Sequence, residues 1–139
     1  MRDFHTVDLD QEYPDYPLDI LSKWVDVLLF YANDWDAIFE KRPTYFTQEF
    51  WYLLVGCVLN KWQGTPLTVS AAAQMMKTGS NRTREERIKK AEQDRYIIKT
   101  PSPADGRVML VLPSPKLEAL MRRHLSVTID KAMSALKAD

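Results

Sequence analysis

The chain has 139 residues, enough for one domain with a sizeable core. Its composition, 45% hydrophobic and 27% charged, is that of an ordinary globular protein, and no apolar run approaches the roughly 18 residues of a membrane-spanning helix. The acidic start lacks the apolar core of an export signal, and the single cysteine, Cys57, excludes an intrachain disulfide. We therefore expect a cytoplasmic protein with no membrane partner.

The formal net charge is zero, but the charges are unevenly distributed. Residues 1–41 contain three Lys/Arg and ten Asp/Glu, whereas residues 67–124 contain twelve and six. A basic segment of this size can bind nucleic acid, while the acidic part stays away from phosphates. An unevenly charged solvated surface would give the same counts, so charge alone does not decide between the two.

Residues 1–17 contain five acidic residues, two prolines and few aliphatic residues, which predicts an extended acidic N-terminal arm. Its carboxylates and His5 have no regular ligand spacing, so we expect no metal site. No glycine-rich phosphate loop or histidine–nucleophile motif occurs elsewhere in the sequence. An enzyme is accordingly the least supported class of function, and no cofactor is expected.

Residues 18–41 are expected to form a long helix with an unusually wide apolar surface. The helical stripe comprises Ile20, Trp24, Val27, Leu28, Tyr31, Trp35, Ile38 and Phe39, and a second strip comprises Val25, Leu29 and Ala32. Such a helix is either buried within its own domain or packed partly against a second subunit. We favour the second subunit, because a chain of this size has few places to bury a long helix with two apolar strips.

A second helix is predicted after Pro43, with Thr47 as its N-cap. One continuous helical face is expected to carry Trp51, Leu54, Val55, Val58, Leu59 and Trp62. Cys57 falls between these positions with no adjacent cation to lower its pKa, so we interpret it as a packed small hydrophobe and not as a redox sensor.

Residues 67–112 have the order of elements of a winged helix-turn-helix. Thr68 can cap a short helix from Val69 to about Lys77, and Gly79 can take a left-handed conformation in the turn that follows. Ser80 or Asn81 can cap a basic helix over residues 82–95. Two strands, 96–100 and 107–112, are then joined by a Pro/Gly-rich loop as a two-stranded hairpin.

The basic helix is expected to enter a DNA major groove. Ile88 and Ala91 mark its buried side. The opposite face and its flanks carry Arg82, Thr83, Glu86, Arg87, Lys89, Lys90 and Gln93. The predicted DNA-binding residues are Ser80, Asn81, Arg82, Thr83, Arg84, Arg87, Lys89, Lys90 and Arg107. A mobile charged surface helix is the alternative, but the position between a capped short helix and a hairpin favours DNA reading.

The predicted wing has its tip at Asp105, Gly106 and Arg107. Arg107 can reach a minor groove, where negative potential favours arginine, or it can pair with Asp105 and stiffen the wing. After the wing, Ser114 can cap a C-terminal amphipathic helix that has Pro115 at its first position. His124 lies beside the apolar stripe of this helix and is expected to be a packing or surface residue.

The predicted fold is therefore mainly α with a small β-hairpin wing (α+β), a winged helix-turn-helix with long N- and C-terminal dimerisation helices. Residues 18–139 are expected to form a single domain. Within it, 18–62 and 114–138 would be dimerisation and scaffold helices, and 67–112 the DNA-binding unit.

Four short motifs accompany these elements, namely Pro66-Leu67-Thr68, Arg95-Tyr96-Ile97-Ile98-Lys99, Asp105-Gly106-Arg107 and Val111-Leu112-Pro113. With these motifs the chain resembles the MarR family of bacterial transcriptional regulators. The resemblance implies a homodimer that represses or activates genes and is released from DNA by a small, often aromatic, ligand or by oxidation. Two positions depart from the family pattern, because Glu86 stands where an arginine is usual and Arg95 where a glycine is usual.

The function expected from the sequence is a homodimeric, sequence-specific regulator that binds double-stranded DNA, with repression as the favoured sign. Trp24, Tyr31, Trp35, Trp51 and Trp62 could line a pocket for an aromatic effector, or simply form core. The alternative is a winged-helix module for protein–protein interaction or assembly, which the acidic arm and the acidic residues of the basic helix favour.

Overall fold

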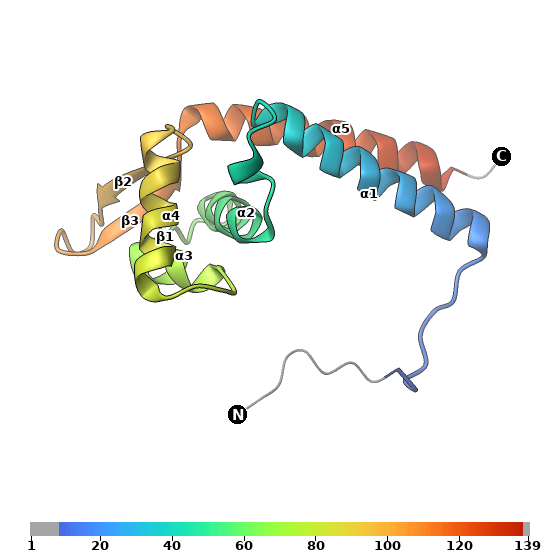
Figure 1. The fold of residues 1–139 in the computed structure, drawn as a ribbon, viewed down its shortest axis with the longest axis horizontal. Helices are drawn as coiled ribbons and strands as arrows, with labels where there is room; N and C mark the ends of the chain where they lie inside the picture. Colours follow the sequence, from blue (N-terminus) through green and yellow to red (C-terminus); the bar gives the residue numbers. More distant parts are fainter. Residues whose placement is uncertain (1–8, 138–139) are drawn as a thin grey trace.

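The computed structural model describes residues 9–137, so part of the predicted arm (residues 1–8) lies outside the described residues. The elements in chain order are α1 (Leu18–Ile38), the 3₁₀ helix η1 (Pro43–Tyr45), α2 (Gln48–Trp62), β1 (Leu67–Thr68), α3 (Val69–Met75), α4 (Asn81–Gln93), β2 (Ile97–Pro101), β3 (Met109–Pro113) and α5 (Pro115–Leu136) (Figure 1). The predicted mainly helical fold with a small antiparallel sheet is confirmed.

Helices α1 and α5 lie side by side and run away together from the rest of the molecule (Figure 1). Ser114 caps α5 as predicted, since its hydroxyl accepts a hydrogen bond from the Leu117 N–H at 3.1 Å. His124 of α5 is fully buried, and its Nδ1 lies 2.6 Å from a carboxylate oxygen of Asp34 in α1. The expected packing role of His124 therefore includes a polar link between the two long helices.

The sheet has three strands in the order β1-β3-β2, and both pairings are antiparallel. The predicted two-stranded hairpin is thus correct for β2 and β3 but incomplete. The chain entering α3 runs extended beside β3, with Leu67 opposite Val111. This pairing satisfies backbone groups of β3 that would otherwise form an open sheet edge.

Helix α2 is buried at the centre of the core, and its buried side agrees with the predicted face only at Leu54 and Val58. Its buried residues are Phe50, Leu53, Leu54, Gly56, Cys57 and Val58. Leu59 and Trp62 are exposed instead. Periodicity alone selected one stripe, whereas α2 contacts η1, α3, β1 and β3 and therefore buries several sides. The burial of Cys57 raises the pKa of its thiol to about 12, which agrees with a packing role.

Two helix ends differ from the sequence prediction for a local reason. Helix α1 ends at Ile38 and not at residue 41, because Glu40 and Lys41 both adopt left-handed backbone conformations with φ of 60° and 58°. Helix α4 ends at Gln93 in a Schellman motif. In this motif the N–H of Tyr96 donates to the Ala91 carbonyl and the N–H of Arg95 to the Glu92 carbonyl.

The Schellman motif requires a left-handed residue at position 95, so an arginine there is under backbone strain that a glycine would not have. Arg95 has φ of 67°, in the left-handed region that glycine adopts most easily. Its carbonyl accepts a hydrogen bond from the Ser114 hydroxyl at 2.7 Å, so the conformation also connects the end of α4 to the start of α5. The fold needs this backbone geometry whichever residue occupies the position.

We expect Arg95→Gly to stabilise the protein by about 0.5–1 kcal/mol. Relief of the left-handed strain, about 1–2 kcal/mol, exceeds the extra chain entropy that glycine loses on folding, about 0.5–1 kcal/mol. Urea unfolding followed by circular dichroism measures the difference. The control is Gln93→Gly in the last turn of α4, which should destabilise by about 0.5–1 kcal/mol. Destabilisation by Arg95→Gly would contradict the assigned strain.

Candidate nucleic-acid interface

The turn between α3 and α4 has the geometry that the sequence predicted. Gly79 has φ of 101°, which few side chains tolerate. Ser80 is the N-cap of α4, since its hydroxyl accepts a hydrogen bond from the Thr83 N–H at 3.2 Å. Thr68 caps α3 in the same way through the Ala71 N–H at 3.1 Å. Both helices of the helix-turn-helix therefore begin at N-cap residues that the sequence predicted.

Helix α4 is attached to the core by a narrow apolar stripe, and its outward face is polar. Ile88 and Ala91 are its buried residues, as predicted. Asn81, Arg82, Lys89 and Lys90 are exposed. The N-terminal end of α4, with its free amides, also faces outward and can hold a phosphate. The outward face thus carries the polar and basic groups that a DNA backbone needs.

Two carboxylates moderate the positive charge of this face. The side chain of Arg82 is 89% exposed, and its Nε lies 3.2 Å from Glu86 one turn further along α4. Lys90 lies 3.3 Å from Asp94 in the same spacing. An exposed pair such as Arg82–Glu86 contributes only a few tenths of a kcal/mol, so Arg82 can exchange its carboxylate for a phosphate.

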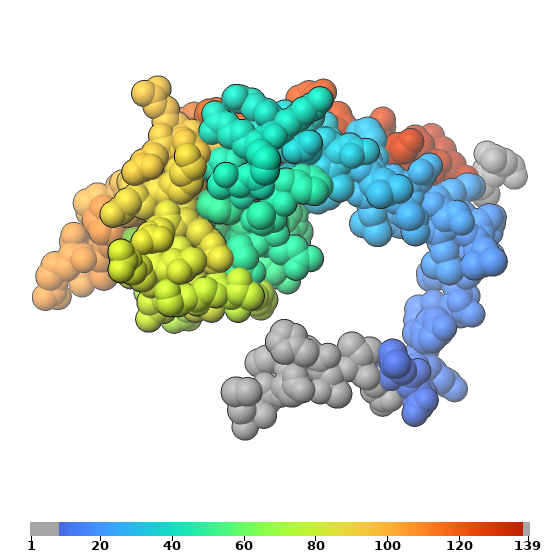
Figure 2. All heavy atoms as spheres, viewed as in Figure 1, coloured from blue at the N-terminus to red at the C-terminus, as the bar shows by residue number. Residues whose placement is uncertain are grey.

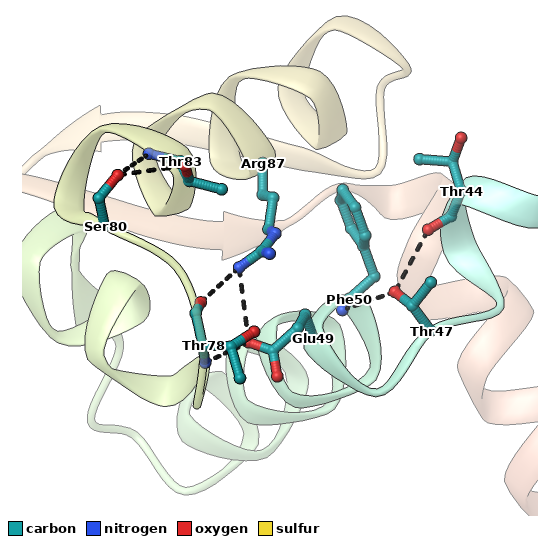
Figure 3. Close-up of polar contacts among 8 residues, drawn as sticks. All are labelled: Thr44, Thr47, Glu49, Phe50, Thr78, Ser80, Thr83 and Arg87. Carbon is teal, nitrogen blue, oxygen red and sulfur yellow. Dashed lines mark hydrogen bonds and ion pairs between the residues drawn. The ribbon is translucent and has the colours of Figure 1, made fainter.

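Arg87 and Arg84 differ from the other basic residues predicted to bind DNA, because both are half-buried. Nη1 of Arg87 donates to the Thr78 carbonyl at 2.7 Å and lies 3.5 Å from Glu49 of α2 (Figure 3). Nε of Arg84 is buried without a hydrogen-bond partner among the described residues. The structure thus turns Arg87 towards α2 and the turn, where its guanidinium is already bonded.

The wing projects from the body at the far end from α1 (Figure 2). The side chain of Arg107 is 92% exposed, and its Nε lies 3.2 Å from Asp105. Asp105 also accepts the backbone N–H of Arg107 at 3.0 Å, and these two bonds lower the pKa of its carboxyl group. Of the two roles considered for Arg107, the pairing that stiffens the wing is present in this structure.

A second polar cluster holds the C-terminal end of α4. The hydroxyl of Tyr45 donates to Asp94 at 2.6 Å, and Arg42 lies 3.4 Å from the same carboxylate. Burial alone would raise the pKa of Asp94, but the hydrogen bonds from Tyr45 and Lys90 outweigh it and lower the pKa. Burial together with the bond to Asp94 raises the pKa of Tyr45. The Asp94 carboxylate therefore remains ionised at the C-terminal end of α4 at neutral pH.

Two cavities lie between the long helices and α2. The first has a volume of about 400 Å³ and is lined by Tyr31, Ala32, Trp35, Phe46, Thr47, Gln48, Trp51 and Tyr52. The second has a volume of about 430 Å³ and includes Leu28, Trp62, Met121 and Leu125. Tyr31 and Trp51 line both cavities, and the Trp51 indole N–H donates to the Tyr31 hydroxyl. Of the predicted pocket residues, Trp24 lines neither cavity and is exposed on α1.

One residue that contacts the helix-turn-helix, Glu49, was not predicted from the sequence. It lies 29 residues before Thr78 in the chain, yet it accepts the Thr78 N–H at 2.9 Å. The only signal was a carboxylate in the first turn of a capped helix, which many helices have. Within the described residues no cluster of potential metal ligands occurs, and no helix there is long and apolar enough to cross a membrane.

No protein-family model and no curated protein sequence matches the chain. Solved structures do match. Transcriptional regulator Tm0710 from Thermotoga maritima aligns with a TM-score of 0.54 and 15% identity, covering 88% of this chain and 83% of that one. Transcriptional regulator PA4135 aligns at 0.52 and 15%, covering 88% and 81%. AbsC, a MarR family regulator from Streptomyces coelicolor, aligns at 0.49 and 13%, covering 91% and 82%.

At these identities the likeness is one of fold. The chain has the winged-helix fold found in transcriptional regulators, as its sequence predicted.

Proposed function

We propose that the protein is a homodimeric regulator of transcription that binds double-stranded DNA in the cytoplasm. The observation that carries the proposal is the exposed polar face of α4, presented on a winged-helix fold beside a projecting wing. Helix α4 would enter the major groove, and the wing would lie along the backbone or minor groove. The proposed contacts are Ser80, Asn81, Arg82, Thr83, Arg84, Arg87, Lys89, Lys90 and Arg107. Repression is the sign of regulation we favour.

Phosphate contacts would supply most of the affinity, so binding should weaken steeply with salt. Arg82, Lys89, Lys90 and Arg107 are exposed in each protomer. If a dimer neutralises six to ten phosphates, affinity for a labelled duplex should fall by about 10³–10⁵-fold between 50 and 200 mM salt. Arg82→Ala should lower the slope of the salt dependence by about one for each phosphate that the arginine no longer neutralises.

Fluorescence anisotropy measures both quantities. Arg122→Ala is the control, since Arg122 is an exposed arginine of α5 away from the helix-turn-helix. Salt-insensitive binding, or no binding to any duplex, would refute the proposal.

The outer halves of α1 and α5 support the proposed dimer. They expose large apolar side chains that a monomer would leave in water, namely Leu18, Leu21, Trp24, Val25, Leu28, Leu29, Ile129, Met133 and Leu136. Contiguous apolar surface of this kind marks a protein interface. Because α1 and α5 pack on each other, both helices can offer these side chains to a second copy.

We expect Val25→Glu to convert the dimer into a monomer, because it would bury a charge against the partner's apolar surface. Sedimentation equilibrium measures the mass in solution. Gln93→Glu adds the same charge at an exposed polar position of α4, away from α1 and α5, and should leave the dimer intact. A wild-type protein that remains monomeric at micromolar concentration would exclude this interface.

We further propose that a small aromatic molecule in the first cavity releases the protein from DNA. The lining of this cavity combines aromatic rings with neutral polar side chains, which suits a planar ligand. Thr47, Gln48 and Trp51 belong to the start of α2, on the same turn as Glu49, which contacts the helix-turn-helix. Occupation of the cavity therefore acts next to the DNA-reading unit.

Ala32→Phe tests the ligand proposal by filling this cavity with a ring from the protein itself. Benzoate and its neutral counterpart benzamide, added separately, should weaken duplex binding by the wild type and have no effect on Ala32→Phe. Ala37→Phe places the same ring at an exposed position of α1 and should respond like the wild type. If neither compound changes the anisotropy of the wild-type complex, an aromatic effector of this size is not supported.

One observation favours the alternative function, a module for protein–protein interaction or assembly. Glu85 and Glu86 are exposed on α4, where a DNA backbone would repel them. Recovery of a protein partner, together with no enrichment of any DNA sequence, would favour this alternative.

A further inference from the structure

The turn from residue 76 to residue 80 sets the angle between α3 and α4, but apolar packing barely holds it. Met76 is buried, whereas Lys77, Thr78, Gly79 and Ser80 are all exposed. Segments with few buried apolar contacts open easily. Some other interaction must therefore fix the orientation of the reading helix.

Glu49 and Arg87 provide that interaction by holding both backbone groups of Thr78 (Figure 3). The Glu49 carboxylate accepts the Thr78 N–H at 2.9 Å, and Arg87 donates to the Thr78 carbonyl at 2.7 Å. The two side chains lie 3.5 Å apart. They are only 16% and 21% exposed, so water screens the pair less than it screens a surface ion pair.

Gly79 makes room for this arrangement. A Cβ atom at position 79 would lie 3.0 Å from Nη1 of Arg87 and 3.2 Å from Cγ2 of Thr83. The glycine thus serves two needs, its left-handed φ and the close passage of the arginine. A larger residue at position 79 would therefore displace the Arg87 side chain from the turn.

The other end of the interaction rests on a rigid element. Glu49 lies in the first turn of α2, between the Thr47 cap and the buried Phe50. A carboxylate at a helix N-terminus is favoured by the helix dipole. Because Phe50, Leu53 and Leu54 anchor α2 in the core, the carboxylate has a fixed position relative to the rest of the fold.

We infer that Glu49 is a positioning residue for DNA reading: it fixes the turn before α4 and orients Arg87 without touching DNA itself. This inference rests on the proposed function. It reverses the simple electrostatic expectation, under which a carboxylate near the DNA-binding face weakens binding by repelling phosphates. Here the carboxylate is already bonded to the turn, so its loss should weaken binding.

The test compares Glu49→Ala and Glu49→Gln with a matched control, Glu118→Ala, in the full-length protein. Glu118 of α5 also joins α2 to another element, since it accepts from Lys61 at 2.7 Å and from Trp62 at 3.0 Å, and both of these partners lie in α2. The measurements are affinity for a duplex selected from a random pool, base preference in that pool, hydrogen exchange of the Thr78 amide, and thermal unfolding.

Glu49→Ala should lower duplex affinity by about tenfold, relax base preference and speed exchange of the Thr78 amide, as expected for loss of a charge-assisted bond. Glu49→Gln, which keeps an oxygen acceptor for Thr78, should fall between the wild type and Glu49→Ala. Glu118→Ala should leave affinity, base preference and Thr78 exchange unchanged, even where it lowers the unfolding temperature as much as Glu49→Ala does.

A double-mutant cycle with Arg87→Ala separates positioning from charge. Removal of Glu49 should have a much smaller effect on affinity when Arg87 is already absent, because the two act through the same turn. Unchanged or tighter binding by Glu49→Ala, with base preference retained, would overturn the inference and leave the proposed function standing. Absence of duplex binding by the wild type would overturn both.

Discussion

The fold depends on the burial of α2, because α3, β1 and β3 of the DNA-reading unit pack against it. This helix contacts η1, α3, β1 and β3, and its residues Leu53, Leu54 and Cys57 are fully buried. Its exposed stripe faces the cavities next to α1 and α5. Helix α2 is therefore the fixed element between the long helices on one side and the helix-turn-helix on the other.

Helix α4 presents the opposite physical problem, since a helix that offers its surface to DNA has little apolar surface left for the core. Ile88 and Ala91 alone are buried along its length. Polar contacts at both ends compensate. Glu49 and Arg87 hold the turn before it, while Tyr45 and Arg42 hold Asp94 after it. The Schellman motif at Arg95 then directs the chain into the wing.

The parts of this architecture that the sequence predicted correctly are those set by residues close together in the chain. Capping residues and helical periodicity located the helices, because Ser80, Thr68 and Ser114 act on amides three residues away. The positive φ of Gly79 followed from glycine chemistry. The strand β1 was missed, and so was part of the buried face of α2, because both are decided by neighbours distant in the chain.

The candidate site shows the same division between local and distant signals. The exposed cations of α4 could be predicted by counting around a helix, and Arg82 and Lys89 lie where expected. The inward turn of Arg87 could not be predicted this way. Its partner, Glu49, is 38 residues away, and a helical wheel contains no information about such a residue.

We propose that α4 reads the sequence of a DNA duplex from a two-fold symmetric dimer. The decisive experiment is selection from a random pool of duplex DNA with the purified protein. We expect enrichment of an inverted repeat whose half-sites lie about one helical turn, or a multiple of it, apart. A pool that remains random after selection, from a protein that is folded and dimeric, would contradict it.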